Sequence, residues 1–189
     1  MENLLIPIGG IFALCVIAII VMFNGMIRLK NTTKESWSNI DIALKRRHDL
    51  IPNLIETVKG YAAHETQVLQ QLTEARNQAA RCSDVLPTRV HDEQVLSSAL
   101  MGFFARVEAY PDLKANTVFL GLQGDLVDTE DKIAAARRFY NSNAKMLNSK
   151  VEQFPHSIIA AQCGIIGVPY FELENLAERE RISVSFNRP

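Results

Sequence analysis

The sequence is poor in the residues that several common classes of site require. Its three cysteines, Cys15, Cys82 and Cys163, lie far apart and form neither a disulfide framework nor a Cys-x-x-Cys metal pair. Only 7% of the residues are aromatic and the formal net charge is −1, so the basic, stacking surface of a nucleic-acid-binding protein is missing. We therefore expect no nucleic-acid partner, and the cysteine usage suits a reducing compartment.

Motifs for metal-dependent or nucleophilic catalysis are also missing. His64-Glu65 begins like the His-Glu-x-x-His motif of zinc proteases, but residue 68 is Val instead of the second His. No Glu has a His three residues later, as a di-iron bundle needs, and no glycine-rich phosphate loop or Gly-x-Ser-x-Gly turn occurs. The sequence thus predicts no catalytic residues, no metal site and no cofactor.

What the sequence does contain is one long uncharged segment near its amino terminus. Leu4–Ile27 carries no charged side chain, and as a helix of about 36 Å it exceeds the roughly 30 Å hydrocarbon core of a bilayer. A cleaved signal peptide is the alternative, but Glu2 is the only charged side chain before the segment and no Ala-x-Ala site follows. We expect a retained membrane anchor over residues 1–30.

Basic residues follow this segment directly. Arg28, Lys30 and Lys34 come after it, and no basic residue precedes it. The positive-inside rule then predicts an amino terminus outside the membrane and a cytoplasmic location for everything after Arg28.

A long apolar stripe follows the anchor and predicts a helix that packs along its whole length. The stripe recurs at alternating three- and four-residue steps. Its members are Trp37, Ile40, Leu44, Arg47, Ile51, Leu54, Val58, Tyr61, Glu65, Val68, Leu72, Ala75 and Ala79. A helix from Thr32 to Cys82 would be about 75 Å long, with a kink or a local break just before Pro52. The rest of the chain, or other copies of it, must cover this stripe.

Two further helices are predicted after a loop at Ser83–Thr88. The first spans about Val90–Tyr110, where Pro111 stops it, and the second spans about Leu113–Glu152 with Asp112 as its N-cap. The predicted apolar face of the first consists of Leu96, Ala99, Phe103, Val107 and Tyr110. Three antiparallel helices with short joins make an all-α bundle, or four if the kink divides the first.

After the anchor, we divide the chain into a helical bundle, residues 31–156, and a carboxyl-terminal region, residues 157–189. Ser157–Val168 is almost wholly apolar but too short to span a bilayer. Packing in the bundle or between subunits is favoured for it, and a place in the membrane interface is the alternative. Leu173–Arg181 is predicted to be helical, and 182–186 alternates like a short strand.

Polar residues interrupt the apolar stripes at positions that the pattern assigns to the core. They are Arg47 and Glu65 in the first helix and Gln123, Glu130 and Arg137 in the third. Because buried charges are costly unless they are paired, we expect Arg–Glu pairs across helices. Such pairs would fix helix register and oligomeric state. A polar pocket for a ligand or partner is the alternative.

Several blocks of the sequence resemble the bacterial LemA family. The most specific block runs from Lys45 to Tyr61. The others are Tyr110–Ala115, Ile133–Arg138 with Tyr140-Asn141, then Phe154-Pro155, and Tyr170–Glu172. The resemblance covers nearly the whole chain in the right order. It departs from the family at Leu147-Asn148, where relatives often carry a second Tyr-Asn, and at Cys163–Ile166.

The resemblance implies a single amino-terminal anchor in the inner membrane and a cytoplasmic antiparallel four-helix bundle, without an established catalytic activity. Some relatives are encoded beside a membrane zinc metalloprotease, and others resemble proteins of the magnetosome membrane. The family signature falls on Asp49, Pro52, Asn53 and Arg137. Kink geometry and polar pairing account for these positions structurally.

The leading functional hypothesis is a noncatalytic membrane-anchored bundle that self-associates into a scaffold or adaptor at the inner membrane. Its expected partners are the lipid bilayer and further copies of the chain. The alternative is a regulatory partner of a membrane protease or sensor. A more remote one is a metal-dependent hydrolase with its site around Glu65, Glu130 and Arg137.

Overall fold

Every regular element in the computed structural model, which describes residues 2–61, 65–81 and 86–171, is a helix. The helices are α1 (Glu2–Lys59), α2 (Thr66–Ala79), α3 (Leu86–Val107), α4 (Pro111–Lys114), α5 (Thr117–Glu152) and α6 (His156–Gln162). The all-α prediction is therefore confirmed over this part of the chain. The helix predicted at Leu173–Arg181 and the strand at 182–186 lie outside the described residues.

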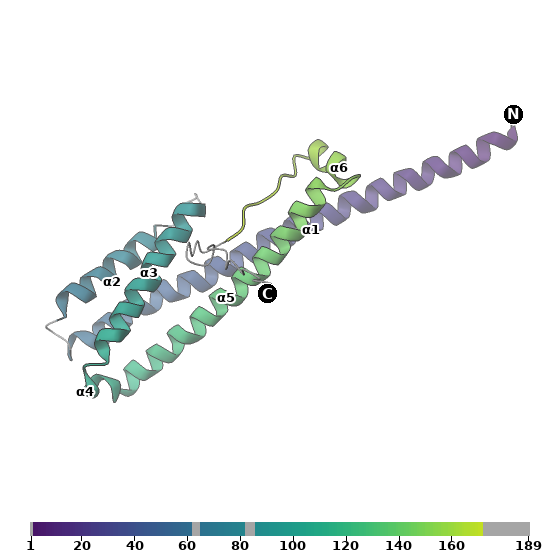
Figure 1. Ribbon diagram of the computed structural model, residues 1–189. Helices are drawn as coiled ribbons and strands as arrows, with labels where there is room; N and C mark the ends of the chain where they lie inside the picture. Colours follow the sequence, from purple (N-terminus) through teal and green to yellow (C-terminus); the bar gives the residue numbers. More distant parts are fainter. Residues whose placement is uncertain (1, 62–64, 82–85, 172–189) are drawn as a thin grey trace, which may run out of the picture.

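A single helix of 58 residues, α1, joins the apolar segment to the body of the molecule (Figure 1). It is about 87 Å long at 1.5 Å per residue. Residues 8–21 are all exposed, because this end of α1 extends past the other helices. Within the described residues, α1 is the one helix long and apolar enough to cross a membrane. The helix runs without interruption through residues 30 and 31, where we divide anchor from bundle.

The continuous helix predicted from Thr32 to Cys82 is wrong. α1 ends at Lys59, a turn follows at Gly60 and Tyr61, and α2 begins at Thr66. Glycine is a poor helix former, and α2 turns back to pack on α1. The stripe continues across the turn because both helices bury their apolar faces in the same core. Tyr61, a predicted core residue, is 46% exposed in the turn.

The other predicted boundaries also move. α3 begins at Leu86 and ends at Val107, and α4 forms a separate short turn before α5 begins at Thr117. The predicted N-cap role of Asp112 is wrong, because this residue lies inside α4. Asn116 caps α5 instead, because its side-chain oxygen accepts hydrogen bonds from the backbone N–H groups of Val118 and Phe119 in the first turn of α5.

Three apolar clusters lie in sequence along α1 and α5. The span-side cluster contains Met26, Leu147, Ala160 and Ile165. The middle cluster contains Ile40, Leu44, Val90, Ile133, Tyr140, Ala144 and Phe171, and so includes the start of α3. The far cluster adds α2 and includes Ile51, Leu54, Leu72, Leu96, Phe103 and Phe119. The α1 stripe is thus covered within one chain, and Ile40, Leu44, Ile51 and Leu54 are at most 1% exposed.

After α6 the chain runs back along α5 as an irregular strap, residues 163–171 (Figure 1). Only the first half of the apolar segment Ser157–Val168 is helical, since α6 ends at Gln162. Gly164 makes the reversal with a φ of 60°, a conformation that favours glycine.

Two asparagine side chains of α5 hold the strap, each through a pair of hydrogen bonds to the backbone N–H and C=O of one strap residue. The amide of Asn148 accepts from the backbone N–H of Val168 at 2.8 Å and donates to its carbonyl at 2.9 Å. Asn141 makes the same pair of bonds to Phe171, at 2.8 and 3.1 Å. A Cβ on Gly167 would lie 2.9 Å from Asn148 Oδ1. The close approach of strap to helix therefore requires glycine there.

Candidate functional site

Two of the charged residues predicted at core positions, Arg47 and Glu130, meet in a charge layer centred on the buried Arg47 of α1. The Arg47 side chain is 0% exposed. It forms an ion pair with Glu93 of α3 and another, at 2.5 Å, with Glu130 of α5. Its guanidinium also donates to Ser97 Oγ at 3.0 Å. The predicted Arg–Glu pairing across helices is thus present, and it joins α1, α3 and α5 at one side chain.

This charge layer separates the middle apolar cluster from the far one. On α1, Arg47 lies between Leu44 of the middle cluster and Ile51 of the far cluster. On α5, Glu130 lies in the same way between Leu126 and Ile133. A shift of one helix along another would move Arg47 from its carboxylates into apolar surroundings, at a large desolvation cost. The layer can therefore fix the register of the helices.

Glu93 is the member of this layer that the sequence analysis missed. Its side chain is 1% exposed, and its Oε1 lies 3.1 Å from His48 Nε2. Burial acts to raise the pKa of Glu93, but the hydrogen bond to His48 and the positive charge of Arg47 outweigh it and hold the pKa below the ordinary value of a glutamate. Glu93 is therefore ionised at neutral pH. The signal was available: position 93 lies one helical turn before Leu96, the first residue of the predicted apolar face.

Arg137 lies beside the charge layer and connects it to the strap. Its guanidinium carbon is 5.0 Å from the centre of the Phe171 ring, in a cation–π contact. Burial lowers the pKa of Arg137, and the positive charge of Arg47 adds to the effect. Phe171 also packs 5.8 Å from the Trp37 ring of α1. The far end of the strap is thus held between α1 and α5.

Glu65 and Gln123 are not part of the charge layer. Glu65 precedes α2 and accepts a hydrogen bond from the Tyr110 hydroxyl at 3.1 Å, which raises the pKa of Tyr110. Gln123 is half-buried in α5. The structure therefore brings Glu130 and Arg137 toward Arg47 but places Glu65 in a separate contact. The hypothetical hydrolase site around Glu65, Glu130 and Arg137 is not a single site.

The signature residues Asp49, Pro52 and Asn53 lie on the exposed side of α1. α1 is continuous through Pro52, so the local break considered there is wrong. Proline has no N–H, and in a helix this leaves the carbonyl four residues earlier, that of His48, without its donor. Arg76 Nε of α2 donates to this carbonyl at 3.1 Å. Pro52 thereby creates an attachment point for α2.

The charge layer is closed to solvent at its centre. Arg47 and Glu93 are at most 1% exposed, and both already make charged hydrogen bonds. Among residues 2–61, 65–81 and 86–171, no group of three His, Cys, Asp or Glu side chains is placed to hold a metal ion. The arrangement is suited to holding helices together.

Comparisons with known proteins agree with the resemblance seen in the sequence. The LemA family model matches residues 36–186, well over half of the chain. Protein LemA of Metamycoplasma hominis is 27% identical over 161 residues, which cover 85% of this chain and 72% of that protein. The match to the family model begins after the apolar segment, so it concerns the helical body.

Two magnetosome proteins are also similar. MamQ of Magnetospirillum gryphiswaldense is 23% identical over 81% of this chain and 65% of that protein. MamQ 2 of Paramagnetospirillum magneticum is 23% identical over 88% of this chain and 73% of that protein. This chain therefore matches slightly less than two thirds of the length of MamQ from Magnetospirillum gryphiswaldense.

Proposed function

This chain belongs to the LemA family, and we propose that it is a noncatalytic membrane-anchored protein that self-assembles as a scaffold or adaptor at the bacterial inner membrane. The observation that carries the proposal is the continuity of α1, which runs from the apolar segment into the body as one helix, Glu2–Lys59. Without a hinge between anchor and body, the body is held in a fixed orientation over the bilayer. That geometry suits organising other molecules at a membrane.

The proposed topology has a single span, an amino terminus outside and a cytoplasmic body. Arg28, Lys30 and Lys34 support this orientation, because they follow the apolar segment directly and no basic residue precedes it. Each of the three is outside the uncharged stretch.

We further propose that α1, α2, α3 and α5 form an antiparallel four-helix bundle. The ion pair of Arg46 with Asp125 and the ring contact of Trp37 with Tyr140 support opposite directions for α1 and α5. Across these two contacts the α1 numbers fall while the α5 numbers rise. The bond of Gln78 to Asp92 joins the end of α2 to the first half of α3, as expected for a helical hairpin.

Self-assembly needs support other than the α1 stripe, since the chain itself buries that stripe. The outer faces of α3 and α5 expose Met101, Val127 and Phe139, which are 54% to 75% exposed. In the anchor, Gly9 and Ala13 make a small-xxx-small pair that can aid helix association. The two relatives named as magnetosome proteins favour a role in organising a membrane.

A second candidate is the regulation of a membrane protease or sensor. It is favoured by the exposure of Asp49, Pro52 and Asn53. Asp49 and Asn53 present their polar side chains on one face of α1, a turn apart, beside Pro52. A heterologous partner would recognise this face.

Photo-crosslinking in cells distinguishes the two candidates. A benzoylphenylalanine is placed at Met101 or at Asn53 of the full-length chain, with the exposed Asp112 of α4 as the control position. Adducts between two copies, formed from Met101 and not from Asp112, would support self-assembly. A dominant adduct with a different protein from Asn53 would support regulation. If neither position gives more adduct than Asp112, both candidates are contradicted.

A further inference from the structure

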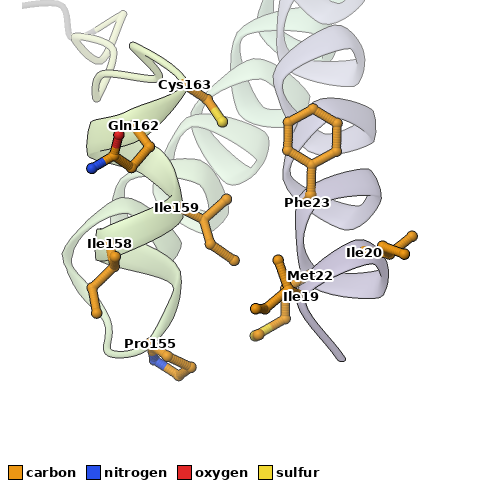
Figure 2. Close-up of a pocket in the computed structure, with 9 residues that line it drawn as sticks. All are labelled: Ile19, Ile20, Met22, Phe23, Pro155, Ile158, Ile159, Gln162 and Cys163. Carbon is orange, nitrogen blue, oxygen red and sulfur yellow. The ribbon is translucent and has the colours of Figure 1, made fainter. Parts of the chain in front are cut away.

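A second feature of the molecule lies at the end opposite the α2–α4 region, where α6 faces the anchor. An apolar groove of about 530 Å³ separates the two helices. Figure 2 shows Ile159 of α6 and Cys163, the residue just after α6, turned toward α1, where Met22 and Phe23 form the other wall. Gln162 is the one amide side chain on the lining, and no charged side chain lies on it.

The position of this groove relative to a bilayer can be derived from the residues of α1 that line it. Phe23 and Ile19 precede Arg28, the first charged residue after the apolar segment, by five and nine residues. At 1.5 Å per residue they lie about 7 and 14 Å beyond Arg28 along the helix. Half of a bilayer's hydrocarbon core is about 15 Å. If α1 crosses the membrane, its groove wall therefore lies within the hydrocarbon region, and α6 is held beside it.

The chain around α6 has the composition that such a position demands. No Asp, Glu, Lys or Arg occurs between Glu152 and Glu172. Three large apolar side chains of this stretch point away from the protein: Phe154 is 77% exposed, Ile158 is 56% and Ile166 is 77%. In water these side chains would be costly, whereas lipid tails would cover them.

Exposed cationic side chains lie next to the groove, on the side of the helical body. Arg28 and Lys30 follow the span on α1, and Lys145 and Lys150 lie near the end of α5. Arg28, Lys145 and Lys150 line one shallow groove between α1 and α5, so charges from the two helices gather at the same height. If α1 crosses the membrane, these cations lie near the lipid phosphates, where they would attract anionic lipids. The charges and the apolar surface thus follow the profile of one membrane leaflet.

We infer that α6 and its flanking residues, 154–166, lie in the same leaflet that α1 crosses, with lipid acyl chains in the groove and around Phe154, Ile158 and Ile166. This inference rests on the proposed membrane anchor. The body is then fixed to the membrane at two places, and rotation about the α1 axis is prevented. Ala160 and Ile165 of this segment pack against Met26 and Leu147, in agreement with the favoured prediction of bundle packing. The exposed side chains on its other face are the part that we assign to the membrane.

Spin-label accessibility tests this on the full-length chain. Its native cysteines, Cys15, Cys82 and Cys163, are replaced by alanine, and the protein is reconstituted in vesicles of phosphatidylethanolamine and phosphatidylglycerol. Single labels are placed at Phe154, Ile158 and Ile166. Phe12→Cys reports on the anchor, and Ile42→Cys is an aqueous control, because Ile42 is an apolar residue of similar exposure, 68%, on the part of α1 that follows the apolar segment. Collisions with oxygen, which concentrates in lipid, are compared with collisions with a water-soluble nickel complex.

Lipid contact predicts oxygen-to-nickel ratios at Phe154, Ile158 and Ile166 that resemble the ratio at Phe12 and exceed the ratio at Ile42 several-fold. A ratio like that of Ile42, with Phe12 still in lipid, overturns the inference and leaves the anchor standing. Shielding of Ile158 from both reagents also overturns it, because that result marks a protein interface. If Phe12 itself is reached by nickel, the membrane anchor fails, and the inference fails with it.

Discussion

Arg47 carries a full positive charge in a place without solvent, at 0% exposure. Its contacts with Glu93, Glu130 and Ser97 compensate for the loss of water. Pairs of this kind add little net stability compared with a well-packed apolar core, but removing one partner leaves an uncompensated buried charge. Single substitutions in the charge layer are therefore expected to be far more damaging than substitutions of exposed charges.

Replacing Arg47 tests this expectation directly. Arg47→Met leaves Glu93 buried without its cation and should lower the free energy of unfolding by about 3–5 kcal/mol. Urea denaturation followed by circular dichroism measures the change. The neighbouring Arg46 is a matched control: its side chain is 52% exposed and pairs with Asp125, so Arg46→Met should cost about 1 kcal/mol or less. Equal effects of the two substitutions would contradict a structural role for the layer.

Glu93 gives the layer a defined response to acid. Its folded-state pKa lies below that of a glutamate in the unfolded chain, so its contribution to stability is complete above that ordinary pKa, about pH 4.3, and is lost as the pH falls through the lower folded-state pKa. Glu93→Gln should lower stability at neutral pH and flatten the decline in acid. Unfolding free energies measured across this range test both effects. Glu56→Gln, at a side chain that is 71% exposed, should leave the pH dependence unchanged, and a flattening there would count against Glu93.

At the scale of elements, α2 is attached to α1 through the backbone carbonyl of His48. Pro52 leaves this carbonyl without a donor inside α1, and Arg76 of α2 donates to it instead. Arg76→Ala should cost about 1–3 kcal/mol, because it leaves the His48 carbonyl without a donor. In a Pro52→Ala background the restored N–H of residue 52 can serve that carbonyl, so the same substitution should cost less. A double-mutant cycle of urea-unfolding energies measures the coupling. Strictly additive effects would contradict the link, and Arg81→Ala, at an exposed residue just after α2, is the control.

The strap offers a second test at this scale, based on two glycines. Gly167→Ala places a methyl group against Asn148 Oδ1 and should speed hydrogen exchange of the Val168 and Phe171 amides, which Asn148 and Asn141 protect. Gly121→Ala meets nothing within 4 Å and should stabilise α5 by about 0.5–1 kcal/mol without changing that exchange. Exchange rates measured residue by residue decide. Unaltered protection in Gly167→Ala would show that the strap does not depend on this contact.

These elements also show what periodicity can and cannot predict. The apolar stripe correctly identified Ile40, Leu44, Arg47 and Ile51 as buried, because each helix must turn such a face to its neighbours. It did not reveal the turn at Gly60, since a stripe looks the same whether the next helix continues or folds back. The strap was missed because asparagine side chains bonded to backbone leave no periodic signal.

Side-chain partners were predicted only in part. Burial of Arg47 implies an anionic partner, and Glu130 was among the candidates because it interrupts its own stripe. Glu93 was not, because the face of α3 was read only from Leu96 onward. Contacts such as that of Arg137 with the Phe171 ring depend on where the strap turns back, and no local pattern specifies that.

At the scale of the whole molecule, the charge layer, the apolar clusters and the span lie along one unbroken helix, α1. Because this helix is continuous, the anchor fixes the orientation of the body, and the body fixes the orientation of any molecule that it binds. If copies associate through both anchor and body, each contact strengthens the other, because tethering in one membrane raises the local concentration of the chains.

The most direct test of self-assembly is the mass of the full-length protein in a mild detergent, measured by light scattering beside a chain that begins at Asn31. We predict that the full-length protein forms a defined oligomer and that the shorter chain does not, because anchor and body assemble together. If the full-length protein is a monomer at every concentration tested, the proposed self-assembling scaffold is contradicted.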